Sequence, residues 1–493
     1  MSRILIHLVC LVFMLAVVGV AEGVPRDPDP ADGTIIRDTW VPLSWTPGDN
    51  AASHSIYVGE NRDEVKAGTG DTFRANQVDT AYAVGFTGFP YPDGLTKGAT
   101  YYWRIEDVEA DGVTAHSGPV WSFTIAPKTA YSPDPVDGTT FVDPNVVLSW
   151  EPGFGAILHT VYFGEDYDTV NNAANGIPQG ALTYTPGTLE SGKVFYWRVD
   201  EFHGVETVKG DVWSFTTSGT VGSPRPAPCA VNVKDYQILR WSPADNSASY
   251  QVYFGTDKEA VRMAGAGSPE HKGSKNLGSE SYDPGPLERY AIYYWRVDAV
   301  DSGGGTLKGP VWTFRTADFL VVEDFEDYTD NDANGEAIWQ TWVDGFGVGT
   351  NGSQVGYLMP PYAEQTIIHG GTQSMPLVYD IDLKYAEASL TLVYPVDWTE
   401  GGVDTLTLWF RGDAANTEAP IYVALNDNAI VAHDDTSATL IDAWTQWNIP
   451  LQVFTDLGVG LTNVNTIAIG VGDKANVQPG GTGTMYIDDV GLH

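Results

Sequence analysis

The chain has 493 residues, among them 54 glycines and 30 prolines, and 12% of its residues are aromatic. Its 64 acidic residues outnumber its 26 basic residues, and the net charge of −38 argues against nucleic acids and anionic membranes as partners. Hydrophobic residues make up 43% of the chain, so it can form folded domains, and its length predicts about three to five of them.

The first 21 residues have the pattern of a secretory signal peptide. Arg3 precedes an apolar run from Ile4 to Val20, and the small residues that end at Ala21 suit a cleavage site. A membrane anchor is the alternative, because the run approaches the length that spans a bilayer. After cleavage Cys229 remains as a single thiol, which cannot form an internal disulfide. We interpret it as a small residue of a proline-rich linker.

Three segments of the chain repeat one pattern with a period of about 100 residues, which suits a whole domain. The pattern opens with LSWTPGDNAASHSIYVG (43–59), LSWEPGFGAILHTVYFG (148–164) and LRWSPADNSASYQVYFG (239–255). Each copy then contains a YWR motif and a second, later tryptophan. Short alternating apolar runs between Gly, Pro, Asn and Asp residues predict an antiparallel sandwich of seven strands.

Residues 25–317 resemble bacterial fibronectin type III domains in these motifs. In each copy a tryptophan follows the first apolar strand: Trp45, Trp150 and Trp241. In each copy a leucine also precedes an aromatic residue by six positions: Leu95 and Tyr101, Leu189 and Phe195, Leu287 and Tyr293. The resemblance implies a corner tyrosine whose hydroxyl bonds to the backbone, a bond that Phe195 cannot make. The recurring tryptophans are interpreted as core residues. We expect three spacer domains, at 25–126, 127–218 and 219–317.

Residues 318–493 contain no fourth copy but many alternating runs, which predict a two-sheet jelly roll. The runs include DTLTLWFRG (404–412), APIYVALND (419–427) and GTMYIDDVGL (483–492). Together with PPYAEQTIIHGGTQSMPLVYD (360–380), they make this part similar to jelly-roll carbohydrate-binding modules, in particular to a C-terminal domain of exported planctomycete-type proteins. The predicted fold is therefore all-β: three fibronectin type III-like sandwiches and a jelly roll.

The same resemblance implies a structural Ca²⁺ held between the first and last strands of the jelly roll. Period-two alternation puts Asp324 and Glu326 on one face, and Asp488 and Asp489 end the last strand. Calcium takes six to eight oxygen ligands, and backbone carbonyls of residues 371–374 could complete the shell. The alternative is that these are solvated surface acids.

Sugars bind by stacking on aromatic rings beside polar groups. Trp409 and Arg411 share one face of their run, and Tyr422 and Asn426 share the outer face of the next. If the two strands are neighbours in one sheet, these four residues form a sugar-binding patch. The alternatives are a loop that covers this face, packing of Trp409 against the second sheet, or platforms in the loops: Trp339, Trp342, Tyr357 and Tyr362. Trp447 is expected in the core.

Catalysis has little support in the sequence. Asp434 and Asp435 are adjacent, which points their carboxylates apart and makes a poor glycosidase pair. Glu364 and His369 could meet as acid and base, but the HGG sequence is more simply a turn. We expect an exported, non-catalytic bacterial protein that binds polysaccharide at the cell surface or outside the cell. The alternatives are a structural or adhesive surface protein without sugar binding, and a jelly-roll lyase or hydrolase.

Overall fold

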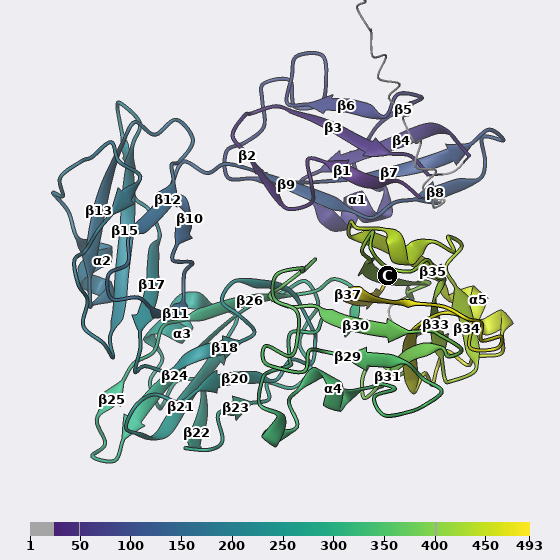
Figure 1. Ribbon diagram of the computed structural model, residues 1–493. Coiled ribbons are helices and arrows are strands. Elements are labelled where there is room, and N and C mark those ends of the chain that lie inside the picture. Colours follow the sequence, from purple (N-terminus) through teal and green to yellow (C-terminus); the bar gives the residue numbers. More distant parts are fainter. Residues whose placement is uncertain (1–23, 49, 400–401) are drawn as a thin grey trace, which may run out of the picture. The chain divides into compact units, whose positions relative to one another are not determined.

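The computed structural model describes residues 24–48, 50–399 and 402–493, and the predicted signal peptide lies outside these ranges. The chain divides into two compact units, one ending at Ala126 and one starting at Pro127 (Figure 1). The described residues form four pairs of sheets, so the prediction of an all-β chain of sandwiches is confirmed. None of the described helices is both long and apolar enough to cross a bilayer.

The first unit is a sandwich of two sheets. One sheet has the order β1-β3-β6 and the other β2-β9-β7-β4-β5, with β8 paired to β7. The strands are β1 Arg26–Asp29, β2 Thr34–Ile36, β3 Val41–Thr46, β4 Ala51–Gly59, β5 Phe73–Gln77, β6 Ala81–Val84, β7 Thr100–Glu109, β8 Ala115–Ser117 and β9 Trp121–Ile125.

The second sandwich repeats this topology, with sheets β10-β12-β14 and β11-β17-β15-β13 and with β16 paired to β15. Its strands are β10 Tyr131–Asp134, β11 Thr139–Val142, β12 Leu148–Glu151, β13 Leu158–Gly164, β14 Thr183–Tyr184, β15 Val194–Phe202, β16 Thr207–Val208 and β17 Val212–Thr217.

The third sandwich has sheets β18-β20-β23 and β19-β26-β24-β21-β22, with β25 paired to β24. Its strands are β18 Gly222–Arg225, β19 Ala230–Val233, β20 Leu239–Ser242, β21 Ser247–Gly255, β22 His271–Asn276, β23 Ser281–Tyr282, β24 Ile292–Asp301, β25 Thr306–Leu307 and β26 Trp312–Thr316.

Three tryptophans form the centre of each sandwich, as the recurrence in the sequence predicts. In the first sandwich Trp103 is fully buried, and its ring centroid lies 4.7 Å from that of Trp121 and 6.5 Å from that of Trp45. The corner tyrosine is also confirmed. The hydroxyl of Tyr101 accepts a hydrogen bond from the Thr96 amide at 3.0 Å. The third sandwich has the same bond, from the Glu288 amide to Tyr293 at 2.9 Å, and the second has a buried phenylalanine in its place.

A short helix that the sequence analysis missed follows the same strand in each sandwich: α1 Arg62–Ala67, α2 Tyr167–Asn172 and α3 Lys258–Met263. In α3 the carboxylate of Asp257 accepts the Ala260 amide at 2.7 Å and so caps the N-terminus. The arginine of the third YWR motif, Arg296, donates at 2.6 Å to the carbonyl of Val261 and at 2.8 Å to that of Ala264. The YWR arginine therefore satisfies carbonyls that the helix end leaves free.

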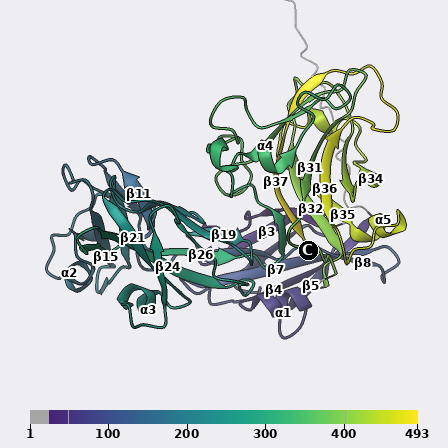
Figure 2. The same ribbon diagram turned by 90° about the horizontal axis from the view of Figure 1, so that it is seen from below.

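The last domain consists of two sheets, with orders β29-β30-β37-β32-β35 and β28-β31-β36-β33-β34 (Figure 2). In the first sheet β27 also pairs with β37, so the first and last strands of this domain are neighbours. Its strands are β27 Leu320–Glu323, β28 Trp342–Val343, β29 Ser353–Val355, β30 Met375–Asp380, β31 Ala386–Thr391, β32 Thr405–Arg411, β33 Ile421–Leu425, β34 Ala429–Ala432, β35 Thr445–Pro450, β36 Thr466–Val471 and β37 Thr482–Leu492. Its helices are α4 Ile338–Thr341, α5 Leu451–Asp456 and the 3₁₀ turns Asp332–Asn334 and Ala438–Leu440.

The inner faces of these two sheets enclose one apolar core. Leu406, Leu408 and Phe410 of β32 point into it and are fully buried, as their alternation predicts. Trp447 and Trp342 also belong to this core. Trp447 is where the sequence analysis expects it, whereas Trp342 is excluded as a surface platform.

Candidate functional site

Trp409 and Arg411 lie on the outer face of the β37-β32-β35 sheet, because the residues between and beside them fill the core. Both side chains are partly exposed. Trp409 is paired across the sheet with Asp488 of β37 on one side and with Gln446 of β35 on the other. Arg411 is paired with Tyr486 of β37. Three strands therefore bring an indole, a guanidinium, a phenol and an amide to one surface.

A loop that precedes β30 brings His369 onto this surface. The imidazole of His369 stacks on the indole of Trp409, with the ring centroids 3.8 Å apart and the planes at 17°. The ring of Trp444 meets the same imidazole at 5.8 Å, edge to face. On its other side His369 Nδ1 lies 2.7 Å from Oδ2 of Asp489. We call the surface formed by Trp409, Arg411, His369, Trp444 and Tyr486 the Trp409 face.

Three carboxylates hold the His369 loop by accepting its backbone N–H groups. Asp488 accepts the amides of His369 at 2.9 Å and Gly370 at 3.2 Å. Glu326 accepts the amide of Thr372 at 2.8 Å, and Glu364 accepts that of Thr366 at 2.6 Å. These hydrogen bonds tie the backbone of the loop to β37, to the turn after β27 and to Glu364, so the loop is well fixed.

Glycine is favoured where this loop approaches the carboxylates, most strongly at Gly371, whose backbone lies in the left-handed region. At Gly371, which has φ +63°, a Cβ atom would lie 2.3 Å from Oε1 of Glu326. At Gly370 a Cβ atom would lie 2.4 Å from Oδ2 of Asp489. The HGG sequence is therefore a close approach of backbone to carboxylates.

A further tyrosine extends the Trp409 face along the loop. The hydroxyl of Tyr357 donates a hydrogen bond to Glu364, and Tyr486 is among the neighbours that raise the pKa of Tyr357. Glu364 and His369 are thus each bonded to a different residue and do not form an acid and base pair with one another.

Asp488, which is paired with Trp409 across the sheet, differs from an ordinary surface carboxylate. Burial and the adjacent Asp489 raise the pKa of Asp488 to about 8, so this carboxyl group is neutral below that pH.

Two of the four predicted sugar-binding residues lie elsewhere. Tyr422 belongs to β33, which is in the other sheet, and its side chain is 2% exposed and donates to Glu387 Oε2 at 2.9 Å. Asn426 lies in the turn after β33, where its Oδ1 accepts the Asn465 amide at 2.7 Å. The assumption that β32 and β33 are neighbours was wrong, because the chain crosses from one sheet to the other between them.

Of the four residues of the predicted calcium site, Glu326, Asp488 and Asp489 contact the loop of residues 369–373, and Asp324 contacts a lysine instead. Asp324 Oδ1 lies 2.9 Å from Nζ of Lys234, a residue of the third sandwich. Glu326 and Asp488 accept the loop amides described above, and Asp489 faces His369. Within the ranges that the structure describes, no three His, Cys, Asp or Glu side chains are placed to hold a metal ion together. In this structure an ammonium and backbone amides are the partners of these carboxylates, and the calcium site stays a prediction.

The remaining candidates of the sequence analysis are loop aromatics. Trp339 is 39% exposed and meets Tyr362 edge to face at 6.0 Å. Of the two loop tryptophans named as alternative platforms, Trp339 reaches the surface and Trp342 is buried.

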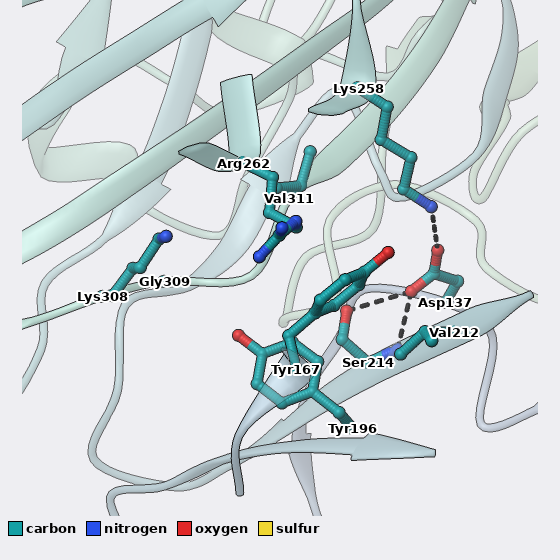
Figure 3. A pocket seen from close by; sticks show the side chains of 10 residues that line it. All are labelled: Asp137, Tyr167, Tyr196, Val212, Ser214, Lys258, Arg262, Lys308, Gly309 and Val311. Carbon is teal, nitrogen blue, oxygen red and sulfur yellow. Dashed lines mark hydrogen bonds and ion pairs between the residues drawn. The ribbon is translucent and has the colours of Figure 1, made fainter. Parts of the chain in front are cut away.

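A small pocket lies between the second and third sandwiches (Figure 3). Asp137 at its edge accepts the Ser214 amide at 2.8 Å and pairs with Lys258 at 3.1 Å. The rings of Tyr167 and Tyr196 and the guanidinium of Arg262 form its walls. Its volume of about 20 Å³ suits one water molecule and is far too small for a sugar ring.

Comparisons with known proteins identify no family. No family model matches the chain, and no curated protein does. Among solved structures, one from work on the promiscuous specificity of carbohydrate-binding modules of the β-sandwich superfamily matches with 13% identity. The match covers 55% of this chain and 96% of the other, at a TM-score of 0.24. The FN1–FN3 domains of chicken CNTN1 match with 14% identity over 59% and 99%, at 0.16.

A third match is the Bacteroides ovatus mixed-linkage glucan utilization locus protein SGBP-B in complex with a heptasaccharide. It has 10% identity over 94% of each chain, at a TM-score of 0.17. These TM-scores are too low to support an argument about function, which therefore rests on the residues of this chain.

Proposed function

We propose that this chain is an exported, non-catalytic bacterial protein that binds polysaccharide through the Trp409 face. The observation that carries the proposal is the partly exposed indole of Trp409, set among His369, Trp444 and Arg411 on an ordered sheet. Sugar rings stack their apolar faces on aromatic rings, and their hydroxyls bond to guanidinium, amide and carboxylate groups.

The His369 loop favours a binding role for the Trp409 face over a purely structural role. Three carboxylates and two glycines fix His369 face to face on the indole of Trp409, so a loop covers one face of this ring, and His369 and Trp444 add their own rings to the surface. A surface that is ordered before the ligand arrives loses less conformational entropy on binding. Because Asp489 remains on the face and the chain carries a charge of −38, the proposed ligand is a neutral polysaccharide.

The three sandwiches act as spacers in this proposal, and the signal-like N-terminus takes the protein out of the cell. Without glycan binding, the chain would be a structural or adhesive surface protein. A lyase or hydrolase is the second alternative. It would release unsaturated products or new reducing ends from a polysaccharide.

The test is retention of the full chain on insoluble neutral polysaccharides, namely amorphous cellulose, curdlan and agarose, with product analysis of the supernatant. Trp409→Ala is expected to weaken retention about tenfold or more, since one stacking ring and its neighbours are lost. Trp339→Ala is the matched control and should leave retention unchanged. Retention that depends on Trp339 and not on Trp409, or no retention at all, contradicts the proposal.

A further inference from the structure

The first sandwich contains an insertion that the other two sandwiches lack. Thirteen positions separate Tyr82 from Leu95, whereas five separate the equivalent residues Tyr184 and Leu189, and Tyr282 and Leu287. The tyrosines are equivalent because each pairs with the leucine two positions before the first tryptophan of its repeat: Leu43, Leu148 and Leu239. The fold itself therefore does not need the extra residues.

The insertion gathers aromatic rings at the surface. Phe86 is 55% exposed and Phe89 is 42% exposed, and both lie in this segment. Phe86 lies 6.4 Å from the ring of Trp40, which is 47% exposed, and Phe89 meets Tyr82 at 5.8 Å. We call Trp40, Tyr82, Phe86 and Phe89 the Trp40 cluster. Large apolar side chains that cluster on a surface mark sites of interaction.

The backbone of the insertion is ordered by its own hydrogen bonds. The amide of Gly85 donates to the carbonyl of Pro90 at 2.8 Å, and that of Phe89 donates to Phe86 at 2.9 Å. The insertion also fits tightly against the segment before β3 that contains Trp40, because a Cβ atom at Gly85 would lie 2.3 Å from the carbonyl oxygen of Thr39. The backbone that carries Phe86 and Phe89 is thus ordered before any ligand arrives, which favours binding.

The chemistry of the insertion indicates a neutral ligand. Residues 81–92 read AYAVGFTGFPYP and contain no charged side chain, although 18% of the chain is charged. Asp93 follows this run, and the Arg74 guanidinium contacts Tyr91 at its end, whereas Tyr82, Phe86 and Phe89 have only uncharged residues between them along the insertion. A site for an anionic glycan or for an acidic peptide would need Lys or Arg at its centre. The uncharged rings of the Trp40 cluster, with the hydroxyl group of Thr87 beside them in the sequence, are the composition that contacts neutral sugars.

We propose that the Trp40 cluster is a second binding site for a neutral polysaccharide, on the first sandwich. The inference extends the proposed function, because two sites on one chain would bind an insoluble polysaccharide with higher avidity than either site alone. The first sandwich would then be a binding domain, while the second and third, which lack the insertion, remain spacers.

The experiment compares four full-length proteins on amorphous cellulose, curdlan and agarose: the natural chain, Trp40→Ala/Phe86→Ala, Trp409→Ala and the combination of all three. Phe73→Ala is the matched control, since Phe73 is 51% exposed on the same sandwich but outside the insertion. We expect the Trp40/Phe86 variant to bind about tenfold more weakly and the combined variant to lose retention. Unchanged melting temperatures verify that the variants are folded.

The outcomes separate this inference from the proposed function. If Trp409→Ala removes all retention and Trp40→Ala/Phe86→Ala none, the second site does not exist and the Trp409 face stands. If the reverse holds, the Trp40 cluster stands and the proposed function falls. If the Trp40/Phe86 variant changes only the size of the protein in gel filtration, the cluster is a contact between copies of the chain, and the inference is overturned.

Discussion

Nζ of Lys234, just after β19 in the third sandwich, lies 2.9 Å from Oδ1 of Asp324 at the start of the last domain. The same ammonium lies 2.9 Å from Asp327 and 3.5 Å from Glu323. Lys234 is only 6% exposed. Burial alone lowers the pKa of this lysine, but the three carboxylates raise it well above its ordinary value. One side chain of the third sandwich thus supplies the positive charge that the acidic turn after β27 needs.

Replacing Lys234 by methionine should destabilise the joint between the third sandwich and the last domain. The change leaves buried carboxylates without their counter-charge, which costs about 3–5 kcal/mol for a buried ion pair that loses one partner. Calorimetry of the full chain is expected to show a transition at lower temperature. Lys209→Met, at an exposed position, is the control. An unchanged thermogram for Lys234→Met would mean that the ammonium contributes nothing.

If the Lys234 ammonium and the loop amides alone hold the carboxylates of Asp324, Glu326 and Asp488, removing divalent cations should leave the melting temperature of the full chain unchanged. Lys234 and the loop amides already occupy the oxygens of Asp324, Glu326 and Asp488, the residues that the sequence assigned to calcium. A metal that binds only the folded state stabilises it, so a fall in melting temperature with chelator, reversed by Ca²⁺, would establish the calcium site after all.

Phe195→Tyr should stabilise the second sandwich. In the first and third sandwiches the equivalent hydroxyls, of Tyr101 and Tyr293, accept a backbone amide at 3.0 and 2.9 Å. The corresponding amide in the second sandwich is that of Glu190. A restored bond should add about 0.5–1.5 kcal/mol to the free energy of unfolding. The reverse changes, Tyr101→Phe and Tyr293→Phe, should cost a similar amount, and a destabilised Phe195→Tyr variant would show that the hydroxyl does not fit.

The sequence predicts features that depend on periodicity and fails where distant segments meet. Recurring tryptophans and the leucine-to-aromatic spacing locate the core and the corner tyrosine, because both depend on local strand geometry. Trp409 and Arg411 are placed on the correct face by alternation alone. Tyr422 is misplaced because the sequence does not reveal which strands share a sheet.

His369 and Lys234 are missed as partners for a related reason. His369 reaches Trp409 from a loop about 40 positions earlier, and Lys234 reaches Asp324 from another domain. The two candidate groups of the sequence analysis, one for sugar and one for calcium, meet at His369, which contacts both Trp409 and Asp489. Only the HGG sequence hints at this, since paired glycines mark a close approach of the backbone.

The stability of the last domain should fall between about pH 4 and pH 8 through Asp488. Burial, followed by the charge of Asp489, raises the pKa of Asp488 to about 8, while the unfolded carboxyl titrates near its ordinary value of 3.8. Between these values the folded state holds a proton that the unfolded state releases, so the free energy of unfolding decreases as the pH rises. The loss is of the order of a few kcal/mol over this window.

Asp488→Asn tests this, since an amide does not titrate. Its single oxygen can still accept the amides of His369 and Gly370, but its NH₂ group then faces the amide of Asp489, so stability at pH 5 should fall by about 1 kcal/mol. The decisive readout is the slope of urea-unfolding free energy between pH 5 and pH 8, which should flatten in this variant and persist in the exposed control Asp382→Asn. Equal slopes in all three proteins would show that Asp488 is ionised throughout, with its charge stabilised by the loop amides.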